Sequence, residues 1–421
     1  MNREIVVTLL TGGADAHYAF GLATALAGSG AGIDLIGGDE HDFPEFHGHP
    51  RVRFLNLRGD QRPDAGFLRK VFRVLAYYVR LIRYAAAAKP RIFHILWNNK
   101  FQTFDRTLLT LYYKWLGKKI VLTAHNVNAG VRDANDSALN RLTLRIQYRL
   151  ADHIFVHTEK MKKELMDLAA LTADRITVIP YGINNAVPNT SLTTEQARQR
   201  LEIRKGQKVL LFYGHIAPYK GLDYLIAAFR HVAARDERHR LIIAGAPKNC
   251  PKYWELIEQG LREDVEAGRV VLHNRFIPDE ETEVYFKAAD VCVLPYRHIF
   301  QSGVLFMGHS FGLPVLAADV GSLREDVIEG ENGLLFKPED PDELAKAIER
   351  YFGSELYTSL ASRRQQIKAA AEERHSWDLV AQLTTSVYAG LLQILSPAGV
   401  DAGVSDAPKV PRPKDTRSAV L

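Results

Sequence analysis

Short runs of aliphatic and β-branched residues alternate along the chain with longer stretches in which apolar residues recur every three or four positions. This pattern predicts an α/β fold with parallel strands covered by helices, because a strand buried on both faces reads as a continuous apolar run. The predicted strands of the first half are Ile5–Leu10, Ile33–Ile36, Val52–Leu57, Ile92–Leu96, Ile120–Thr123, Ile154–His157 and Thr177–Ile179.

The alternation is interrupted after Pro188, where the chain becomes polar until about Gln207, and then it starts again. The strands predicted beyond this break are Val209–Tyr213, Leu241–Ala244, Val270–His273, Val291–Pro295 and Pro314–Ala317. We therefore expect two doubly wound, Rossmann-like domains, residues 1–190 and 191–376. Their strands would end at a shared cleft, where ligands of such sheets bind.

Residues 377–395 carry apolar positions at helical spacing, and we expect this helix to pack back on the first domain. Residues 396–421 have no such pattern and read as a disordered tail. No apolar run reaches the roughly 18 residues that a spanning helix needs, and Ile5–Leu10 is too short for a signal peptide, so we expect a cytoplasmic protein. Two cysteines, Cys250 and Cys292, are too few for a disulfide framework or a four-cysteine zinc site.

Composition excludes a wholly disordered or fibrous chain, since 47% of the 421 residues are hydrophobic and 24% are charged. The net charge of +5 favours partners that carry phosphate. Residues 60–120 contain 13 lysines and arginines against three acidic residues. Within residues 67–88, a basic helix with aromatic flanks fits either contact with an anionic membrane or a solvated domain surface. Its side chains are Arg69, Arg73, Arg80 and Arg83 beside Phe72, Tyr77, Tyr78 and Tyr84.

Three turns combine small residues with a following helix, an arrangement that exposes backbone N–H groups to an anion. The first, Thr11–Gly13, lacks the G-x-G-x-x-G spacing of a dinucleotide site and also fits a plain tight turn. In the second, Gly214–Gly221, Lys220 stands near a helix start, where a cation is favourable if it shares an anion with the helix; a solvated lysine is the alternative. The third, Gln301–Val304, fits either a phosphate cradle or a simple N-cap by Ser302.

These motifs resemble the retaining glycosyltransferases of family 4, which have the two-domain GT-B fold. The resemblance is strong over about residues 205–350 and looser over 1–190. It rests on the following stretches: Gly214–Gly221, Arg275–Pro278, Tyr285–Asp290, Phe311–Val315, Gly321, Glu325 and Glu329–Leu334, with Gly12, Gly13, Thr123–Asn126 and Pro180–Gly182 in the first half.

The resemblance implies a hexosyltransferase-type enzyme that moves a sugar from a nucleoside-diphosphate sugar to a hydroxyl, with retention of configuration. It implies no metal and no cofactor beyond the donor. The acceptor would be a glycan or a lipid-linked molecule, in the synthesis of a surface polysaccharide or glycolipid. No nucleic-acid recognition module accompanies the basic stretch, so we expect no specific nucleic acid as a partner.

The resemblance also assigns roles to residues. Lys220 and His125 would be catalytic, although a histidine at a strand end is often structural. Residues that would bind the donor diphosphate are Gly13, His215, Lys220, Ser302, Gly303 and Val304. Those near the base and ribose would be Arg275, Ile277 and Met307.

Two departures from the family pattern change the picture. His215 occupies the place of a usual arginine, and Ile299 and Met307 occupy the places of two usual glutamates. An apolar side chain cannot accept a hydrogen bond from a hydroxyl, so His298, Gln301 or His309 would have to substitute. The alternatives are a nucleotide-sugar epimerase or hydrolase, and an inactive member that binds nucleotide sugars.

Overall fold

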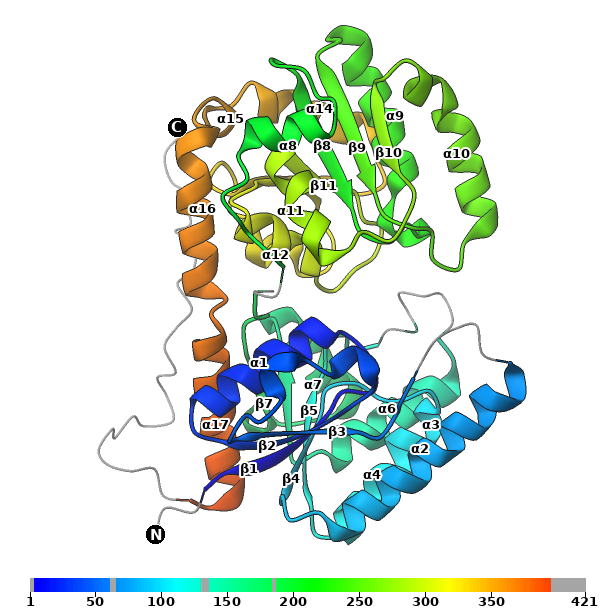
Figure 1. Cartoon of the computed structure of the whole chain (residues 1–421), viewed down its shortest axis with the longest axis vertical. Helices are drawn as coiled ribbons and strands as arrows, with labels where there is room; N and C mark the ends of the chain where they lie inside the picture. The colour runs from blue at the N-terminus through cyan, green and yellow to red at the C-terminus, as the bar shows by residue number, and fades with distance from the viewer. Residues whose placement is uncertain (1–3, 61–65, 129, 131–135, 184–186, 395–421) are drawn as a thin grey trace.

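The structure, a computed structural model, describes residues 4–60, 66–128, 130, 136–183 and 187–394. Figure 1 shows two sheets, one above the other, each covered by helices on both faces. We call the part built on the lower sheet the first lobe and the part built on the upper sheet the second lobe. Helices α16 and α17, from the end of the described chain, run alongside both.

All strands of the first lobe pair in parallel, in the order β3-β2-β1-β4-β5-β6-β7. Their order reverses between β1 and β4, and parallel doubly wound sheets bind ligands outside such a point. The strands are β1 Val6–Leu10, β2 Gly32–Gly37, β3 Val52–Asn56, β4 Ile92–Ile95, β5 Lys119–Thr123, β6 His153–Val156 and β7 Ile176–Val178.

The second lobe repeats this topology with the parallel order β10-β9-β8-β11-β12-β13, and its order reverses between β8 and β11. Its strands are β8 Lys208–Tyr213, β9 His239–Ala244, β10 Val270–His273, β11 Val291–Leu294, β12 Val315–Ala318 and β13 Gly333–Phe336. The α/β fold class is confirmed, and every predicted strand is present. The pattern missed only β13 among the described strands, a four-residue run that begins with glycine.

The helices cover the sheets through apolar faces that join the buried strands in continuous cores. In the first lobe they are α1 Ala16–Gly28, η1 Asp39–His41, η2 Pro44–Phe46, α2 Phe67–Ala87, α3 Gln102–Phe104, the π-helix η3 Asp105–Leu109, α4 Thr110–Trp115, α6 Ala138–Leu150, α7 Glu159–Ala169 and η4 Ala173–Arg175. From the second lobe onward they are α8 Thr194–Arg200, η5 Pro218–Lys220, α9 Leu222–Arg235, α10 Pro251–Glu266, α11 Asp279–Ala288, α12 Gly303–Ser310, α13 Leu323–Asp326, α14 Pro341–Phe352, α15 Glu355–Thr358, α16 Leu360–Arg374 and α17 Trp377–Leu392.

None of the described helices combines the length and the apolar character needed to cross a bilayer.

The sequence predicted that aromatic side chains flank the basic face of α2, and this prediction was wrong for its tyrosines. Tyr77 and Tyr78 of α2 are buried in the core under β4, and the hydroxyl of Tyr84 donates to Asp34 at 2.6 Å. The helix turns these rings inward, so they are unavailable to a membrane.

Helix α17 packs against α1 of the first lobe, whereas α16 packs against α12 of the second. Between them, Trp377 is 9% exposed, and its Nε1 donates to the carbonyl of Ile183 at 2.7 Å. Its ring fills the place where a Cβ at Gly182 would stand, so only glycine fits there. The helix ends at Leu392, three residues earlier than predicted, because Gln393 adopts a left-handed cap with φ of 54°. The predicted tail, 396–421, lies outside the described residues.

We predict that Trp377→Ala lowers the free energy of unfolding by about 3–5 kcal/mol, because it leaves a cavity between α1 and α17 and an unpaired carbonyl at Ile183. Urea unfolding monitored by circular dichroism measures this loss. Trp377→Phe keeps most of the packed ring and should cost less. A loss below about 1 kcal/mol for the alanine variant would show that this contact does not hold α17 in place.

Candidate functional site

Lys220 lies in the loop that follows β8, at the point where the strand order of the second lobe reverses. Gly214 begins this loop with φ of 92°, a conformation that favours glycine. A Cβ at Gly214 would stand 3.1 Å from the Nζ of Lys220 and 3.5 Å from the Cγ2 of Val304. The fold therefore brings Gly214, Lys220 and Val304 together, as the sequence predicted.

The side chain of Lys220 is buried, with 4% of its surface exposed. Burial lowers the pKa of its ammonium to about 8; the nearby thiol of Cys292 acts in the opposite direction and Lys248 in the same one. No salt bridge joins Lys220 to a carboxylate in the part of the chain that the structure describes. The ammonium lies 5.7 Å from the centre of the Tyr296 ring. A cation held in this way is available to a ligand anion.

Helix α12 begins beside Lys220, and Ser302 is its N-cap. The Oγ of Ser302 accepts a hydrogen bond from the amide of Leu305 at 3.4 Å and lies 3.1 Å from the hydroxyl of Tyr296. Ser302 is therefore an N-cap, and the helix that it caps also begins close to Lys220. The amides of Gly303 and Val304, in the first turn, have no carbonyl one turn earlier in the helix, so they can donate to an anion.

Other residues predicted for the donor site lie around this loop with partners of their own. The Nε2 of His215 lies 2.9 Å from the hydroxyl of Tyr219. Arg275 is exposed and forms a salt bridge with Glu281, so its guanidinium already has a carboxylate partner. The side chain of Ile277 is 6% exposed and packs in the core of the second lobe, so the expected contact of this residue with a base falls to its backbone.

Met307 and Ile299 pack against the same apolar core, which explains how the protein tolerates them at these places. His309 does not substitute for a glutamate. It is 3% exposed, its Nε2 lies 3.3 Å from the carbonyl of Asn332, and burial lowers its pKa to about 4. Gln301 lies against the carboxyl of Asp326, whose pKa is raised to about 7 by burial. His298 is exposed.

In the first lobe, Gly13 follows β1 with φ of 72°, and a Cβ there would stand 2.5 Å from the guanidinium of Arg58. The next helix, α1, is capped by Asp15, which accepts from the amide of Tyr18 at 3.0 Å. This carboxylate opposes an anion at the start of α1. The close approach at Gly13 instead serves Arg58, a contact that the sequence did not reveal.

His125 follows β5 and lies in a cluster of aromatic rings. It stacks on Trp97 with 4.1 Å between ring centres and meets Tyr18 edge-on at 4.6 Å. Its Nδ1 lies 3.0 Å from the Nε2 of His157, whose Nδ1 lies 3.2 Å from the carbonyl oxygen of Ile179. The pairing with His157 was not predicted, because it depends on β5 and β6 being neighbours in the sheet.

The hydrogen bonds fix the tautomers of both histidines. Burial lowers the pKa of His157 to about 4; for His125, burial, helped by the adjacent His157, lowers the pKa far below its usual range. Both rings are therefore neutral near pH 7. The Ile179 carbonyl only accepts, so His157 carries its proton on Nδ1 and accepts at Nε2. His125 must then donate from Nδ1, which leaves its Nε2 as an acceptor; this atom is buried and has no protein partner.

Tyr181 connects the two lobes next to these groups. Its hydroxyl donates to Asp15 at 3.0 Å and lies 4.0 Å from where a Cβ at Gly303 would stand. Its ring stacks on Phe306 of α12 at 5.3 Å between centres. A second link joins His17 and Asp279 at 3.1 Å. The start of α12 thus faces the first lobe across Tyr181.

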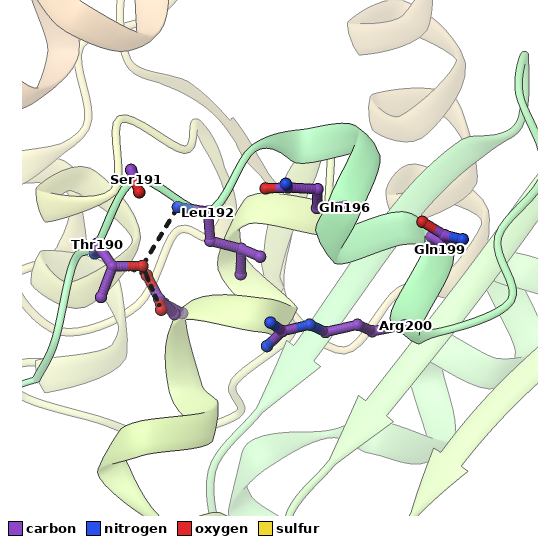
Figure 2. Close-up of a pocket in the computed structure, with 7 residues that line it drawn as sticks. Thr190, Ser191, Leu192, Gln196, Gln199 and Arg200 are labelled. Atoms are coloured by element: carbon purple, nitrogen blue, oxygen red, sulfur yellow. Dashed lines mark hydrogen bonds between the residues drawn. The ribbon is translucent and has the colours of Figure 1, made fainter.

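A separate hollow of about 390 Å³ lies beside α8. Figure 2 shows Thr190, Gln196 and Arg200 around it. Its buried acid, Glu283, accepts from the amide and hydroxyl of Thr190, each at 2.8 Å, and pairs with Lys287 at 2.7 Å. Glu283 thus has its partners within the protein, so it is not available as a free carboxylate in this hollow.

Comparison with known families matches both lobes. Residues 12–187 match the family described as Glycosyltransferase Family 4, and residues 207–354 match the family described as Glycosyl transferases group 1. The chain belongs to glycosyltransferase family 4. The resemblance seen in its motifs is confirmed, and the chain spans a little under two thirds of the length of the first relatives that it matches.

Relatives and solved structures agree with this assignment. The chain is 30% identical over 282 residues to a D-inositol 3-phosphate glycosyltransferase of Corynebacterium diphtheriae, and the match covers 64% of each chain. Sucrose-phosphate synthase of Thermosynechococcus elongatus has a similar fold, with a TM-score of 0.74 and 20% identity over 93% of this chain and 100% of that one. The structure of Anabaena HepE in complex with UDP is also similar, with a TM-score of 0.69 and 18% identity. The match covers 92% of this chain and 100% of that one. These structures establish the GT-B fold.

We predict that His125 remains neutral with its proton on Nδ1 between pH 5.5 and 8. Long-range ¹H–¹⁵N correlation spectra of histidine-labelled protein report the tautomer and charge of each ring. The resonances are assigned with His125→Asn and His157→Asn variants. An imidazolium at pH 7, or a proton on Nε2 of His125, would contradict the arrangement.

Proposed function

We propose that this glycosyltransferase moves a hexosyl group from a nucleoside-diphosphate sugar to a hydroxyl of a glycan or lipid-linked acceptor, with retention of configuration. The observation that carries the proposal is the buried ammonium of Lys220, which has no carboxylate partner among the described residues and adjoins the first turn of α12. This combination suits a diphosphate better than a neutral ligand.

The chemistry follows from where charge appears during transfer. As the bond between sugar and diphosphate breaks, negative charge grows on the leaving phosphate oxygen. Lys220 and the amides of Gly303 and Val304 stabilise that charge more in the transition state than in the bound donor, which accelerates the reaction. The leaving phosphate then accepts the proton of the attacking hydroxyl. In this proposal the residues supply charge and position, and no metal ligand set is invoked.

His125 contributes in a different way. Its Nε2 is an acceptor without a protein partner, so it can accept a hydrogen bond from a hydroxyl of the transferred sugar. Trp97 and His157 hold the ring on two sides, so little orientational freedom is lost when the sugar binds. The UDP bound to HepE and the inositol phosphate in the name of the Corynebacterium relative support a nucleotide donor and a hydroxyl-bearing acceptor.

A second candidate is a member that binds a nucleotide sugar without transferring it. Met307 and Ile299, both packed on the apolar core, favour this candidate, since neither offers a carboxylate to ribose or sugar hydroxyls. Turnover separates the two proposals. Release of nucleoside diphosphate that requires an acceptor supports transfer, whereas binding without release supports the second candidate, and release without acceptor indicates hydrolysis.

We predict that Lys220→Ala weakens transition-state stabilisation by about 2–4 kcal/mol. This loss is measured as a fall in kcat/KM for the best donor. A thermal-shift screen of UDP-, GDP- and ADP-sugars first identifies that donor. In the wild-type protein, affinity for the nucleoside diphosphate should fall as pH rises through about 8, because the free ammonium then loses its proton. The alanine variant should lack this pH dependence.

The control for this prediction is Lys205→Ala, an exposed lysine in the turn before β8. It should keep the wild-type affinity and pH profile. Unchanged kcat/KM in Lys220→Ala, with a donor bound and turned over, would remove Lys220 from the donor site.

We also propose that α2 contacts an anionic membrane. Four exposed apolar side chains follow one face of the helix at spacings of four, three and four residues: Leu68, Phe72, Leu75 and Val79, which are 81%, 74%, 54% and 56% exposed. The arginines Arg69 and Arg80 are exposed on the same helix. Exposed apolar residues beside cations are typical of helices that lie in a bilayer interface.

Helix α4 extends this surface. The hydroxyl of Tyr112 donates to the carbonyl of Ile82 in α2 at 3.2 Å, so the two helices are neighbours. Leu108, Leu111 and Trp115, in the π-helix and α4, are 62%, 46% and 80% exposed. Trp115 suits the headgroup level of a bilayer, where amphipathic rings accumulate.

We predict that the protein floats with vesicles that contain phosphatidylglycerol, and that Phe72→Ser with Leu75→Ser reduces the bound fraction severalfold. Arg69→Glu with Arg80→Glu should do the same, and high salt should reproduce that effect in the wild type. Equal flotation of all variants, or binding to neutral vesicles at the same level, would exclude α2 as the contact surface.

A further inference from the structure

The loop that follows β9 lies against the loop Gly214–Gly221 of the second lobe. The amide of Ile216 donates to the carbonyl of Ala246 at 2.8 Å, and the amide of Lys248 donates to the carbonyl of Ile216 at 2.9 Å. The parallel strands β8 and β9 thus continue to pair beyond their ends. This pairing holds Lys248 beside the loop that carries Lys220.

Close backbone contacts bring the start of the same loop to the ammonium of Lys220. Gly245 has φ of 152°, and a Cβ there would stand 2.0 Å from the carbonyl oxygen of Gly214, so only glycine fits. A Cβ at Gly214 would itself stand 3.1 Å from the Nζ of Lys220. The loop after β9 therefore begins next to the residue that contacts the buried cation.

The turn that carries Lys248 is fixed by a shared hydrogen-bond acceptor. The Sγ of Cys250 donates to the carbonyl of Ile216 at 3.3 Å, and the same oxygen accepts from the amide of Lys248. Between these two residues, Asn249 has φ of 54°, a left-handed conformation that is unfavourable for a residue with a side chain. Strained residues of this kind persist where their surroundings fix them, and they cluster at ligand-binding sites.

Lys248 adds a second positive charge to the site. Its side chain is exposed, and no salt bridge to it occurs among the described residues. Burial lowers the pKa of the Lys220 ammonium to about 8, and the charge of Lys248 adds to that effect. Two like charges held near each other repel, and an anion bound by both removes that cost.

The strand order assigns Lys248 to one of the two phosphates of the donor. In the sheet, β9 lies between β8 and β10 (Figure 1). The loop after β8 carries Lys220, and the loop after β10 carries Ile277, whose backbone is the expected contact of the base. A nucleotide that extends between these two loops passes the loop after β9 with its middle part, which is the phosphate attached to the ribose.

We infer that Lys248 binds the phosphate attached to the ribose of the donor, while Lys220 binds the phosphate bonded to the sugar. This inference rests on the proposed function, because it assumes a nucleoside-diphosphate donor. The charge of the ribose phosphate does not change as the bond to the sugar breaks, so Lys248 stabilises the bound donor and the transition state equally. Loss of Lys248 therefore raises KM for the donor and leaves kcat nearly unchanged, whereas loss of Lys220 lowers kcat.

Calorimetric titration of the full chain with uridine monophosphate and uridine diphosphate tests this assignment. The monophosphate carries only the phosphate next to the ribose, so Lys248→Ala should weaken both nucleotides alike, by about five- to tenfold. Lys220→Ala should weaken the diphosphate more than the monophosphate, and Lys248→Arg should restore most of the affinity. If the thermal-shift screen ranks another base first, the guanosine or adenosine pair replaces the uridine pair.

Lys252→Ala is the matched control, because Lys252 is an exposed lysine in the first turn of α10. It should bind both nucleotides like the wild-type protein. The pH dependence of diphosphate binding is a second measurement. In Lys248→Ala the loss of affinity should occur above the wild-type value of about pH 8, because Lys220 keeps its proton to higher pH once a neighbouring positive charge is removed. Lys252→Ala should not shift this pH.

Three results would overturn the inference: wild-type affinity in Lys248→Ala, a loss no larger than that of Lys252→Ala, or a loss for the diphosphate alone. Failure of the donor proposal gives a different pattern, in which Lys220→Ala binds both nucleotides like the wild type. If Lys220→Ala binds the diphosphate more weakly and Lys248→Ala does not, only the role of Lys248 is excluded.

Discussion

The site is organised around a positive charge that is buried without a counter-charge. Removing an ammonium from water costs several kcal/mol unless a partner compensates, and the lowered pKa of Lys220 is a direct consequence. A carboxylate beside it would stabilise the protein but would also repel a diphosphate. The second lobe instead places Gly214, which has no side chain, against the ammonium and supplies amides at the start of α12, of which Ser302 uses only that of Leu305. Stability is given up locally where a ligand anion can restore it.

The first lobe contributes neutral histidines to the site, in contrast to the buried cation Lys220 of the second lobe. His125 and His157 share one hydrogen bond, and a proton added to the Nε2 of His157 would break it, because two N–H groups would then face each other. Neutral rings therefore suit both the packing and the sugar, whose hydroxyls require acceptors as well as donors. The cation suited to a diphosphate and the acceptor suited to a sugar hydroxyl therefore come from different lobes.

Signals local in the sequence were sufficient to predict the described strands except β13, and the turns that carry Lys220 and Ser302, because glycine, helix starts and apolar runs act within a few residues. Contacts between distant segments were not predictable in this way. His157 lies 32 residues after His125, and Asn99 lies 41 residues after Arg58; each pair depends on which strands are neighbours. Tyr77 and Tyr78 were misassigned to the surface because a basic, aromatic helix does not show which side faces the sheet until β4 is placed beneath it.

The replacement of two expected glutamates is part of the packing rather than a gap in the site. Met307 and Ile299 join the apolar core, and the loop between them is fixed by the amide of Ser322, which donates to the carbonyl of Phe300 at 3.0 Å. A carboxylate placed against that core would need a buried partner, and His309 is not free to provide one, because its Nε2 lies 3.3 Å from the carbonyl of Asn332. A ribose at Met307 would meet a thioether instead of a carboxylate. Recognition of the donor then depends chiefly on its diphosphate, which places the greatest energetic demand on Lys220 and the first turn of α12.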